Sequence, residues 1–128
     1  MTPESFDIAN IVSDLNRTVH EPARLAILTV LSACDSADFV FLKAAAGLTA
    51  GNLSVQISRL EEASLVIVKK IIERRRTVTT VSLTDGGRHE LEEYWSAMDR
   101  IRQSVRQGEI SNSDSPVTPP GRVRPHTA

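Results

Sequence analysis

Apolar positions in the first part of the chain recur at the three- and four-residue spacing of amphipathic helices. One such run consists of Ile8, Ile11, Val12 and Leu15. Thr2 and Pro3 precede this run as a candidate cap and first turn. A second helix is predicted to begin at Glu21 or Pro22, and its buried side comprises Leu25, Ile27, Leu28 and Leu31. The pattern therefore predicts two helices before Cys34.

The following stretch predicts two more helices separated by a tight turn. Asp38 and Phe39 are compatible with a brief strand, and residues 41–46 form a short apolar helix that Gly47 closes. Thr49 is a candidate cap for the fourth helix. The core-facing positions of that helix, within about 60° of one another on a helical wheel, are Leu53, Ile57 and Leu60. Its opposite side is small and largely polar, and consists of Gly51, Ser54, Val55 and Ser58, flanked by Asn52 and Arg59.

Two β-branched runs follow, at residues 65–72 and 78–83, and they predict a hairpin. We expect residues 73–77 to form its tip, with three consecutive arginines, Arg74, Arg75 and Arg76. A long helix is then predicted over residues 85–106, roughly 30 Å in length, with Thr84 as its cap. Gly86 and Gly87 in its first turn lower helix propensity by up to about 1 kcal/mol each, which close backbone packing would explain.

The long helix carries a heptad-like apolar stripe. Because its distal part would extend beyond the body, we expect a partner to cover it, and a two-fold homodimer fits best. Packing within one chain is the alternative. The predicted dimer residues are Ile8, Ile11, Val12, Leu15, Leu91, Tyr94, Trp95, Met98, Ile101 and Val105. The predicted organisation is a dimerisation helix within 1–19, a core over 20–84, a second dimerisation helix over 85–106 and a disordered tail over 107–128, which is rich in Ser, Pro and Thr.

Composition narrows the function classes. The chain has 128 residues, 41% hydrophobic and 24% charged, without an apolar run near the roughly 20 residues of a membrane span. The absence of a signal peptide pattern favours the cytoplasm. A lone Cys34 excludes a disulfide framework and is expected to be half-buried and inert. The three histidines lack metal-ligand spacing, and no catalytic motif is present, so we expect no metal, no cofactor and no enzyme activity.

Charge is distributed by region. The net charge is only −1, yet residues 59–76 hold six basic side chains and three acidic ones. A patch of one sign creates a local field that the average charge hides. The basic residues of this region therefore indicate an anionic partner.

Three stretches resemble the small winged-helix transcriptional regulators of the MarR and ArsR types. They are HEPARLAILTVL (residues 20–31), FVFLKAAAGLTAGNLSVQISRLEEASLV (39–66) and TTVSLTDGGRHELEEY (79–94). The resemblance covers about residues 16–101. It implies a mainly α fold with a small β-hairpin, namely a winged helix-turn-helix with added N- and C-terminal helices. Two departures are Ser64, where such proteins usually have Gly, and Gln56, where relatives often have His.

The resemblance also implies a homodimeric repressor or activator on a pseudo-palindromic DNA site. The expected contacts of the fourth helix and the hairpin are Thr49, Ala50, Gly51, Asn52, Ser54, Val55, Gln56, Ser58, Arg59, Arg74, Arg75 and Arg76. Asn52 and Gln56 suit adenine edges, and the hairpin arginines suit phosphates. Arg59 has an alternative, pairing with Glu61 or Glu62. The alternative function is a winged-helix dimer that binds protein rather than DNA. Any small-molecule effector is expected to act through the interface of the terminal helices.

Overall fold

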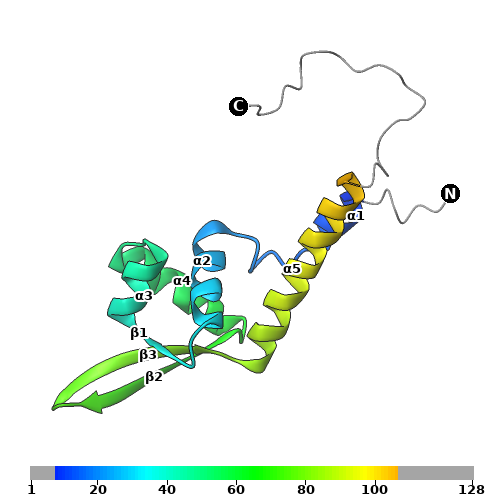
Figure 1. Cartoon of the computed structure of the whole chain (residues 1–128). Coiled ribbons are helices and arrows are strands. Elements are labelled where there is room, and N and C mark those ends of the chain that lie inside the picture. The colour runs from blue at the N-terminus through cyan, green and yellow to red at the C-terminus, as the bar shows by residue number, and fades with distance from the viewer. Residues whose placement is uncertain (1–7, 107–128) are drawn as a thin grey trace, which may run out of the picture.

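The computed structural model describes residues 8–106. Five helices and three strands follow one another in the order that the sequence predicts (Figure 1). They are α1 (Ile8–Ser13), α2 (Pro22–Ser32), β1 (Ala37–Asp38), α3 (Phe39–Ala46), α4 (Ala50–Glu62), β2 (Val66–Glu73), β3 (Arg76–Leu83) and α5 (Asp85–Arg106). The predicted mainly α fold with a small β-hairpin is confirmed. The expected cap at Thr2 and Pro3 and the tail over 107–128 lie outside the described residues.

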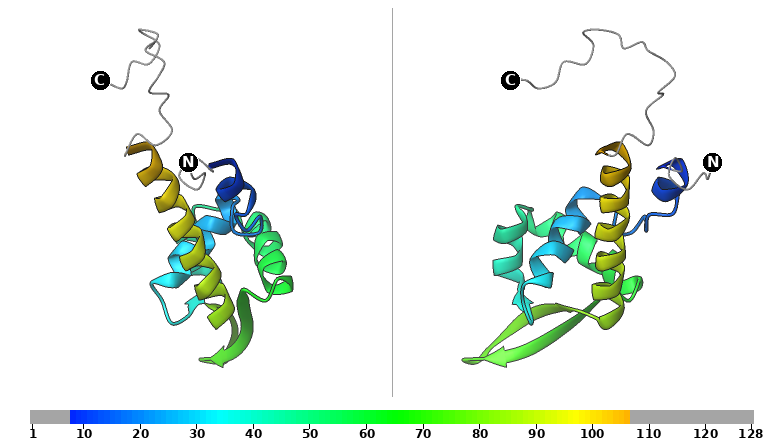
Figure 2. Two further views of the ribbon diagram at one scale, coloured as in Figure 1. Left: turned by 90° about the vertical axis from the view of Figure 1, so that its right-hand side faces the viewer. Right: turned by 45° about the vertical axis from the view of Figure 1, so that its right-hand side comes forward.

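The three strands form one antiparallel sheet in the order β1-β3-β2. β2 and β3 pair along their whole length, from Val66 opposite Leu83 to Glu73 opposite Arg76. The short β1 pairs with the middle of β3, where Ala37 lies opposite Val81. Beyond this point the hairpin projects alone from the body, as a wing, while α5 leaves the body in another direction (Figures 1 and 2).

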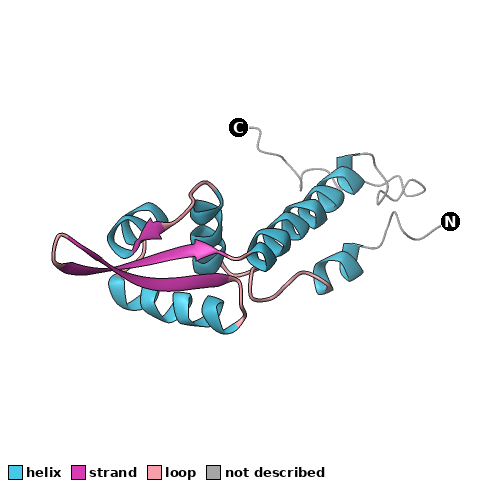
Figure 3. Cartoon of the chain, turned by 90° about the horizontal axis from the view of Figure 1, so that it is seen from below, coloured by secondary structure: helices cyan, strands magenta, loops and turns pink. Residues whose placement is uncertain are grey.

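The core lies where α2, α3 and α4 meet the base of the sheet (Figure 3). Its fully buried side chains are Val19, Ile27, Leu28, Leu31, Leu42, Leu53, Leu60 and Val81. The predicted inner faces of α2 and α4 are confirmed, except that Leu25 is only half-buried. The core therefore fixes which side of α4 faces outward.

Local sequence signals define the helix ends. Glu21 caps α2 with Pro22 in its first turn, and the Thr49 hydroxyl accepts from the Asn52 amide at the start of α4. Gly47 ends α3 with φ 70°. Ser64 adopts φ 63° after α4, so this serine takes the left-handed conformation that glycine would favour. The Leu65 and Ser64 amides donate back to the carbonyls of the last turn of α4, which satisfies them.

The first turn of α5 is joined to the end of α4. The Thr84 hydroxyl accepts from the Gly87 amide at 2.8 Å, which confirms the predicted cap, and donates to the Ser64 carbonyl at 2.8 Å. The Thr84 amide donates to the Leu65 carbonyl at 3.0 Å. A Cβ on Gly87 would lie 2.1 Å from the Leu65 oxygen, so the predicted close backbone packing is confirmed there. At Gly86 the space is ordinary.

α1 is shorter than the apolar spacing implies. It ends at Ser13, so Leu15 lies in the following turn rather than on the helix, although it is buried. The Asn16 side chain accepts from the amides of Thr18 and Val19 and offers the backbone a turn in place of further helix. α1 then packs against α5.

The predicted dimer residues fall into three groups by burial. Four are buried within the chain itself: Ile11, Leu15, Leu91 and Tyr94. Ile8, Met98 and Ile101 are half-buried, whereas Val12, Trp95 and Val105 are exposed. Intrachain packing thus accounts for part of the stripe, and only the remainder offers apolar surface to a second copy. Within residues 8–106, no helix has the length and apolar character that crossing a membrane requires.

Candidate nucleic-acid interface

The outward side of α4 is a polar surface of small side chains. Because Leu53, Ile57 and Leu60 hold the helix to the core, the positions between them face solvent. The exposed residues are Thr49, Ala50, Gly51, Asn52, Ser54, Val55, Ser58 and Arg59. Small side chains allow the helix backbone to approach a surface closely, and the amides at the helix start favour anions. Small polar side chains on an exposed helix face are the chemistry that suits approach to the floor of a major groove.

The two amide side chains of α4 bind each other. Gln56 Nε2 donates to Asn52 Oδ1 at 2.9 Å, one helical turn apart. Gln56 Oε1 accepts from Arg24 Nη1 at 2.8 Å, and Arg24 Nε donates to the Thr18 carbonyl at 2.7 Å. Gln56 is consequently half-buried, with both ends of its amide engaged. An adenine contact by Gln56 requires these bonds to open first.

Arg24 was absent from the residues expected at this surface. It lies on α2, 32 positions before Gln56, and only the packing of α2 against α4 brings the two together. The sequence offered two separate signals: a lone basic residue in the first turn of α2, and Gln56 at the border of the buried face of α4. They can be recognised as partners only when the rotation of both helices is known.

The wing tip differs from the prediction. The strands extend to Glu73 and Arg76, so the turn contains only Arg74 and Arg75 rather than residues 73–77. Both turn residues have positive φ, 52° and 66°. A two-residue turn with both φ values positive matches the right-handed twist of the strands, and usually contains Asn and Gly. Both guanidinium side chains are exposed, and Arg76 begins β3 opposite Glu73.

Arg59 is also exposed, next to the same surface. Among residues 8–106 the ion pair formed is Arg102 with Asp99, so the alternative pairing of Arg59 with Glu61 or Glu62 does not occur there. Arg59 instead borders a shallow depression of about 320 Å³ together with Thr18, Arg24 and Glu62. Its guanidinium is exposed beside this acidic side chain, with which it forms no ion pair within residues 8–106.

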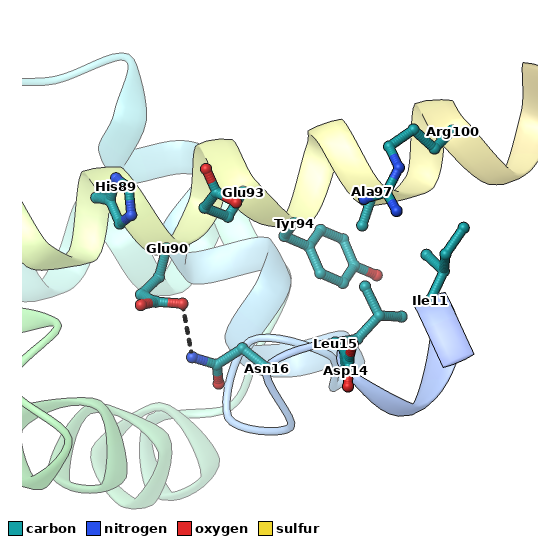
Figure 4. Close-up of a pocket in the computed structure, with 10 residues that line it drawn as sticks. All are labelled: Ile11, Asp14, Leu15, Asn16, His89, Glu90, Glu93, Tyr94, Ala97 and Arg100. Atoms are coloured by element: carbon teal, nitrogen blue, oxygen red, sulfur yellow. Dashed lines mark hydrogen bonds between the residues drawn. The ribbon is translucent and has the colours of Figure 1, made fainter. Parts of the chain in front are cut away.

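A second depression, of about 420 Å³, lies between the α1–α2 connection and α5 (Figure 4). Asn16 Nδ2 donates to Glu90 Oε1 at 3.0 Å across it, and the Tyr94 ring points towards Leu15 (Figure 4). Tyr94 also forms a 2.9 Å hydrogen bond between its hydroxyl and His20 Nδ1. These bonds join α5 to the connection between α1 and α2.

Metal-ligating and thiol side chains do not add a second candidate site within the described residues. Residues 8–106 contain no cluster of three or more His, Cys, Asp or Glu side chains that could hold a metal ion. Cys34 is half-buried, as expected, and its thiol lies 3.4 Å from the Val30 carbonyl oxygen. The exposed face of α4 and the wing are therefore the features that point to a ligand.

Comparison with known proteins decides the family. Residues 23–102, more than half of the chain, match the family described as winged helix DNA-binding domain. The chain belongs to this family. An uncharacterised protein of Methanocaldococcus jannaschii is 34% identical over 71 residues, which are 56% of this chain and 77% of that protein.

Solved winged-helix structures agree with this assignment. A transcriptional regulator homologue from Pyrococcus horikoshii is 28% identical, with a TM-score of 0.69, over 77% of this chain and 95% of that one. The E. coli MarR structure is 20% identical, with a TM-score of 0.57, over 84% and 85%. The transcriptional repressor CouR, bound to a 23-mer DNA duplex, is 22% identical, with a TM-score of 0.61, over 86% and 75%. The last two show the fold alone. The resemblance to winged-helix regulators is confirmed, and the fold is the one that MarR-type structures have.

Proposed function

We propose that this winged-helix protein is a sequence-specific, homodimeric transcriptional regulator. α4 enters the major groove, and the wing lies on the flanking backbone. One observation carries the proposal: an exposed helix face of small polar residues is followed by a turn of two exposed arginines with positive φ. Non-glycine residues in this conformation cost about 1–2 kcal/mol each, and such strain concentrates at functional sites.

Charge and geometry support the DNA partner. Arg59, Arg74 and Arg75 are exposed, and none of them has an ion-pair partner within residues 8–106. Arginine contacts with phosphate supply affinity, while side chains on the groove floor supply specificity. Glu62, exposed at the end of α4, would be repelled by phosphate. Only the first two turns of α4 therefore enter the groove. The DNA-bound repressor CouR has the same fold.

The dimer rests on the apolar residues that the chain leaves uncovered. Val12, Trp95 and Val105 are 46%, 41% and 55% exposed, and all three belong to the terminal helices α1 and α5. A two-fold dimer through these helices would present two copies of α4 to successive major grooves, about 34 Å apart. A small-molecule effector that altered this interface would change that spacing and hence the affinity for DNA.

The alternative is a winged-helix protein-interaction module. It is favoured by the exposed apolar residues Val40, Phe41 and Ile72, which are 73%, 51% and 78% exposed. Val40 and Phe41 border a groove of about 590 Å³ between the start of α3 and the distal part of the wing. This surface differs from the polar face of α4, so the two functions predict different sensitive residues.

Salt-titrated binding to duplex DNA tests the proposal. We expect the affinity of the full chain to fall steeply as salt rises, because each phosphate contact releases counterions. Replacing Arg74, Arg75 and Arg76 with Ala should flatten this slope. A matched control replaces three exposed arginines of α5, Arg100, Arg102 and Arg106, and should leave the slope unchanged at an unaltered oligomeric state. A protein that binds no duplex even at low salt contradicts the proposal and favours the interaction module.

A further inference from the structure

The Arg24 side chain is a fixed donor beneath the outward face of α4. A guanidinium has five N–H donors and no acceptor. Arg24 Nε donates to the Thr18 carbonyl at 2.7 Å, and Arg24 Nη1 donates to Gln56 Oε1 at 2.8 Å. The bond to the backbone of the α1–α2 connection anchors the group. A glutamine side chain can accept from Nη1 only through its amide oxygen, because its NH₂ group is a donor.

This requirement sets the orientation of the Gln56 amide. Because Oε1 faces Arg24, the Nε2 group faces the other way, towards the preceding turn of α4. There it meets Asn52 and donates to Oδ1 at 2.9 Å. The reverse orientation would place an NH₂ group against the guanidinium and leave two donors facing each other. The direction of the chain of hydrogen bonds, from Arg24 through Gln56 to Asn52, thus follows from Arg24.

The same logic determines what Asn52 presents to solvent. Its Oδ1 accepts from Gln56 Nε2, and this bond holds the plane of the Asn52 amide. Its Nδ2 group has no hydrogen-bond partner in the described part of the chain, and the side chain is exposed on the first turns of α4. Asn52 consequently offers donors outward. The adenine contact expected from sequence would, in its bidentate form, need the oxygen and the nitrogen together.

We propose that Arg24 is a specificity-determining positioning residue, which makes Asn52 select guanine over adenine. Guanine presents two adjacent acceptors in the major groove, N7 and O6, whereas adenine presents one acceptor and one donor. An outward NH₂ group complements the first pattern. Arg24 acts through Gln56 and does not touch the base. This inference rests on the proposed function, since it concerns which sequence α4 reads.

Two substitutions change the direction of the hydrogen bonds in different ways. Arg24→Met removes the donor, so the Gln56 and Asn52 amides are free to turn. Gln56→Glu keeps an acceptor for Arg24 but removes the donor to Asn52. The second glutamate oxygen then accepts from Asn52 Nδ2, and Oδ1 is left facing outward. Because Gln56→Glu leaves the bonds of Arg24 in place, it tests the inference even if Arg24→Met folds poorly.

The measurement is the ratio of affinities for matched duplexes. Duplexes selected by the wild-type full chain would be varied at each position between guanine and adenine. We expect Asn52→Ala to abolish the guanine preference at one position in each half-site. Arg24→Met should reduce that preference by about tenfold, and Gln56→Glu should reverse it in favour of adenine. Adding Arg24→Met to Asn52→Ala should have no further effect on the ratio, because Arg24 acts through Asn52. If Arg24 had a purely structural role, Arg24→Met would leave the ratio unchanged in the wild-type background too.

Three outcomes overturn the inference. The first is a base preference that is the same in wild type, Arg24→Met and Gln56→Glu, with DNA binding retained; this contradicts the role of Arg24 and leaves the proposed function standing. The second is an adenine preference of the wild type at the position that depends on Asn52. The third is a wild type that binds no duplex at low salt, which contradicts the proposed function as well.

Discussion

Among the glycines of the described chain, Gly87 is the one where an added methyl group would meet the closest contact. A Cβ there would lie 2.1 Å from the Leu65 oxygen, 3.0 Å from the Leu65 carbonyl carbon and 3.2 Å from its Cα. These are backbone atoms, which cannot turn away as the end of a side chain can. Overpacking of this kind typically costs 1–3 kcal/mol, and alanine regains up to about 1 kcal/mol of helix propensity. We therefore expect Gly87→Ala to lower the free energy of unfolding by about 1–2 kcal/mol.

Gly86 is the matched control for this substitution. It occupies the same first turn of α5, and its Cβ would lie 3.7 Å from Thr84 Oγ1 and 3.9 Å from the Ser64 oxygen. These are ordinary contacts, so Gly86→Ala should raise the stability by up to about 1 kcal/mol. Urea unfolding of both variants at one protomer concentration measures the difference. Two variants that shift the stability in the same direction by the same amount would refute the reasoning.

The contact at Gly87 also has a consequence for α4. Leu65 follows α4 after a single turn, and Thr84 binds both Ser64 and Leu65. If the Leu65 backbone moves to accept a methyl group, the end of α4 must adjust with it. Weaker DNA binding is therefore expected for Gly87→Ala but not for Gly86→Ala, measured on folded protein by fluorescence anisotropy.

Three further variants follow from the structure. Replacing Arg74 with Asn and Arg75 with Gly suits the positive φ values of the turn. The free energy of unfolding should rise by about 1–2 kcal/mol, and the salt dependence of DNA binding should become weaker. A lower stability in urea would contradict this. Ser64→Gly removes the strain of a serine at φ 63° and should stabilise the fold by up to about 1 kcal/mol. The greater freedom of glycine in the unfolded chain offsets part of this gain. A Tm below that of the wild type would be inconsistent with this reasoning. Trp95→Ser combined with Val105→Ser should yield monomers in equilibrium sedimentation, and an unchanged dimer would exclude these residues from the interface.

The order of the elements could be predicted because the signals are local. The caps Thr49 and Thr84, the closing Gly47 and the inner face of α4 all depend on residues within one or two turns. The limits of α5 were also predictable, since the cap and the apolar stripe agree. The predicted wing tip was longer than the observed turn. The prediction used β-branched residues to mark the strands, and these cannot show that charged residues such as Glu73 also pair.

The remaining features depend on how distant segments pack. The heptad-like stripe of α5 could not show whether Leu91 and Tyr94 are covered by their own chain or by a second copy. They are covered by their own chain, and Tyr94 hydrogen-bonds His20, 74 positions earlier. Similarly, Asn52 and Gln56 were predictable as polar residues of α4, but the bond from Arg24 that orients them arises only when α2 packs on α4. Apolar periodicity identifies a buried face, not the element that buries it.

Selection of bound sequences from random DNA duplexes tests the central claim most directly. The full chain, at moderate salt, should enrich a pseudo-palindromic motif whose half-sites are centred about one helical turn apart, because two copies of α4 would read successive major grooves. Asn52→Ala should lose one specified position in each half-site while keeping the spacing. A pool without enrichment, or a motif that is unchanged by substitutions on α4, would contradict the account.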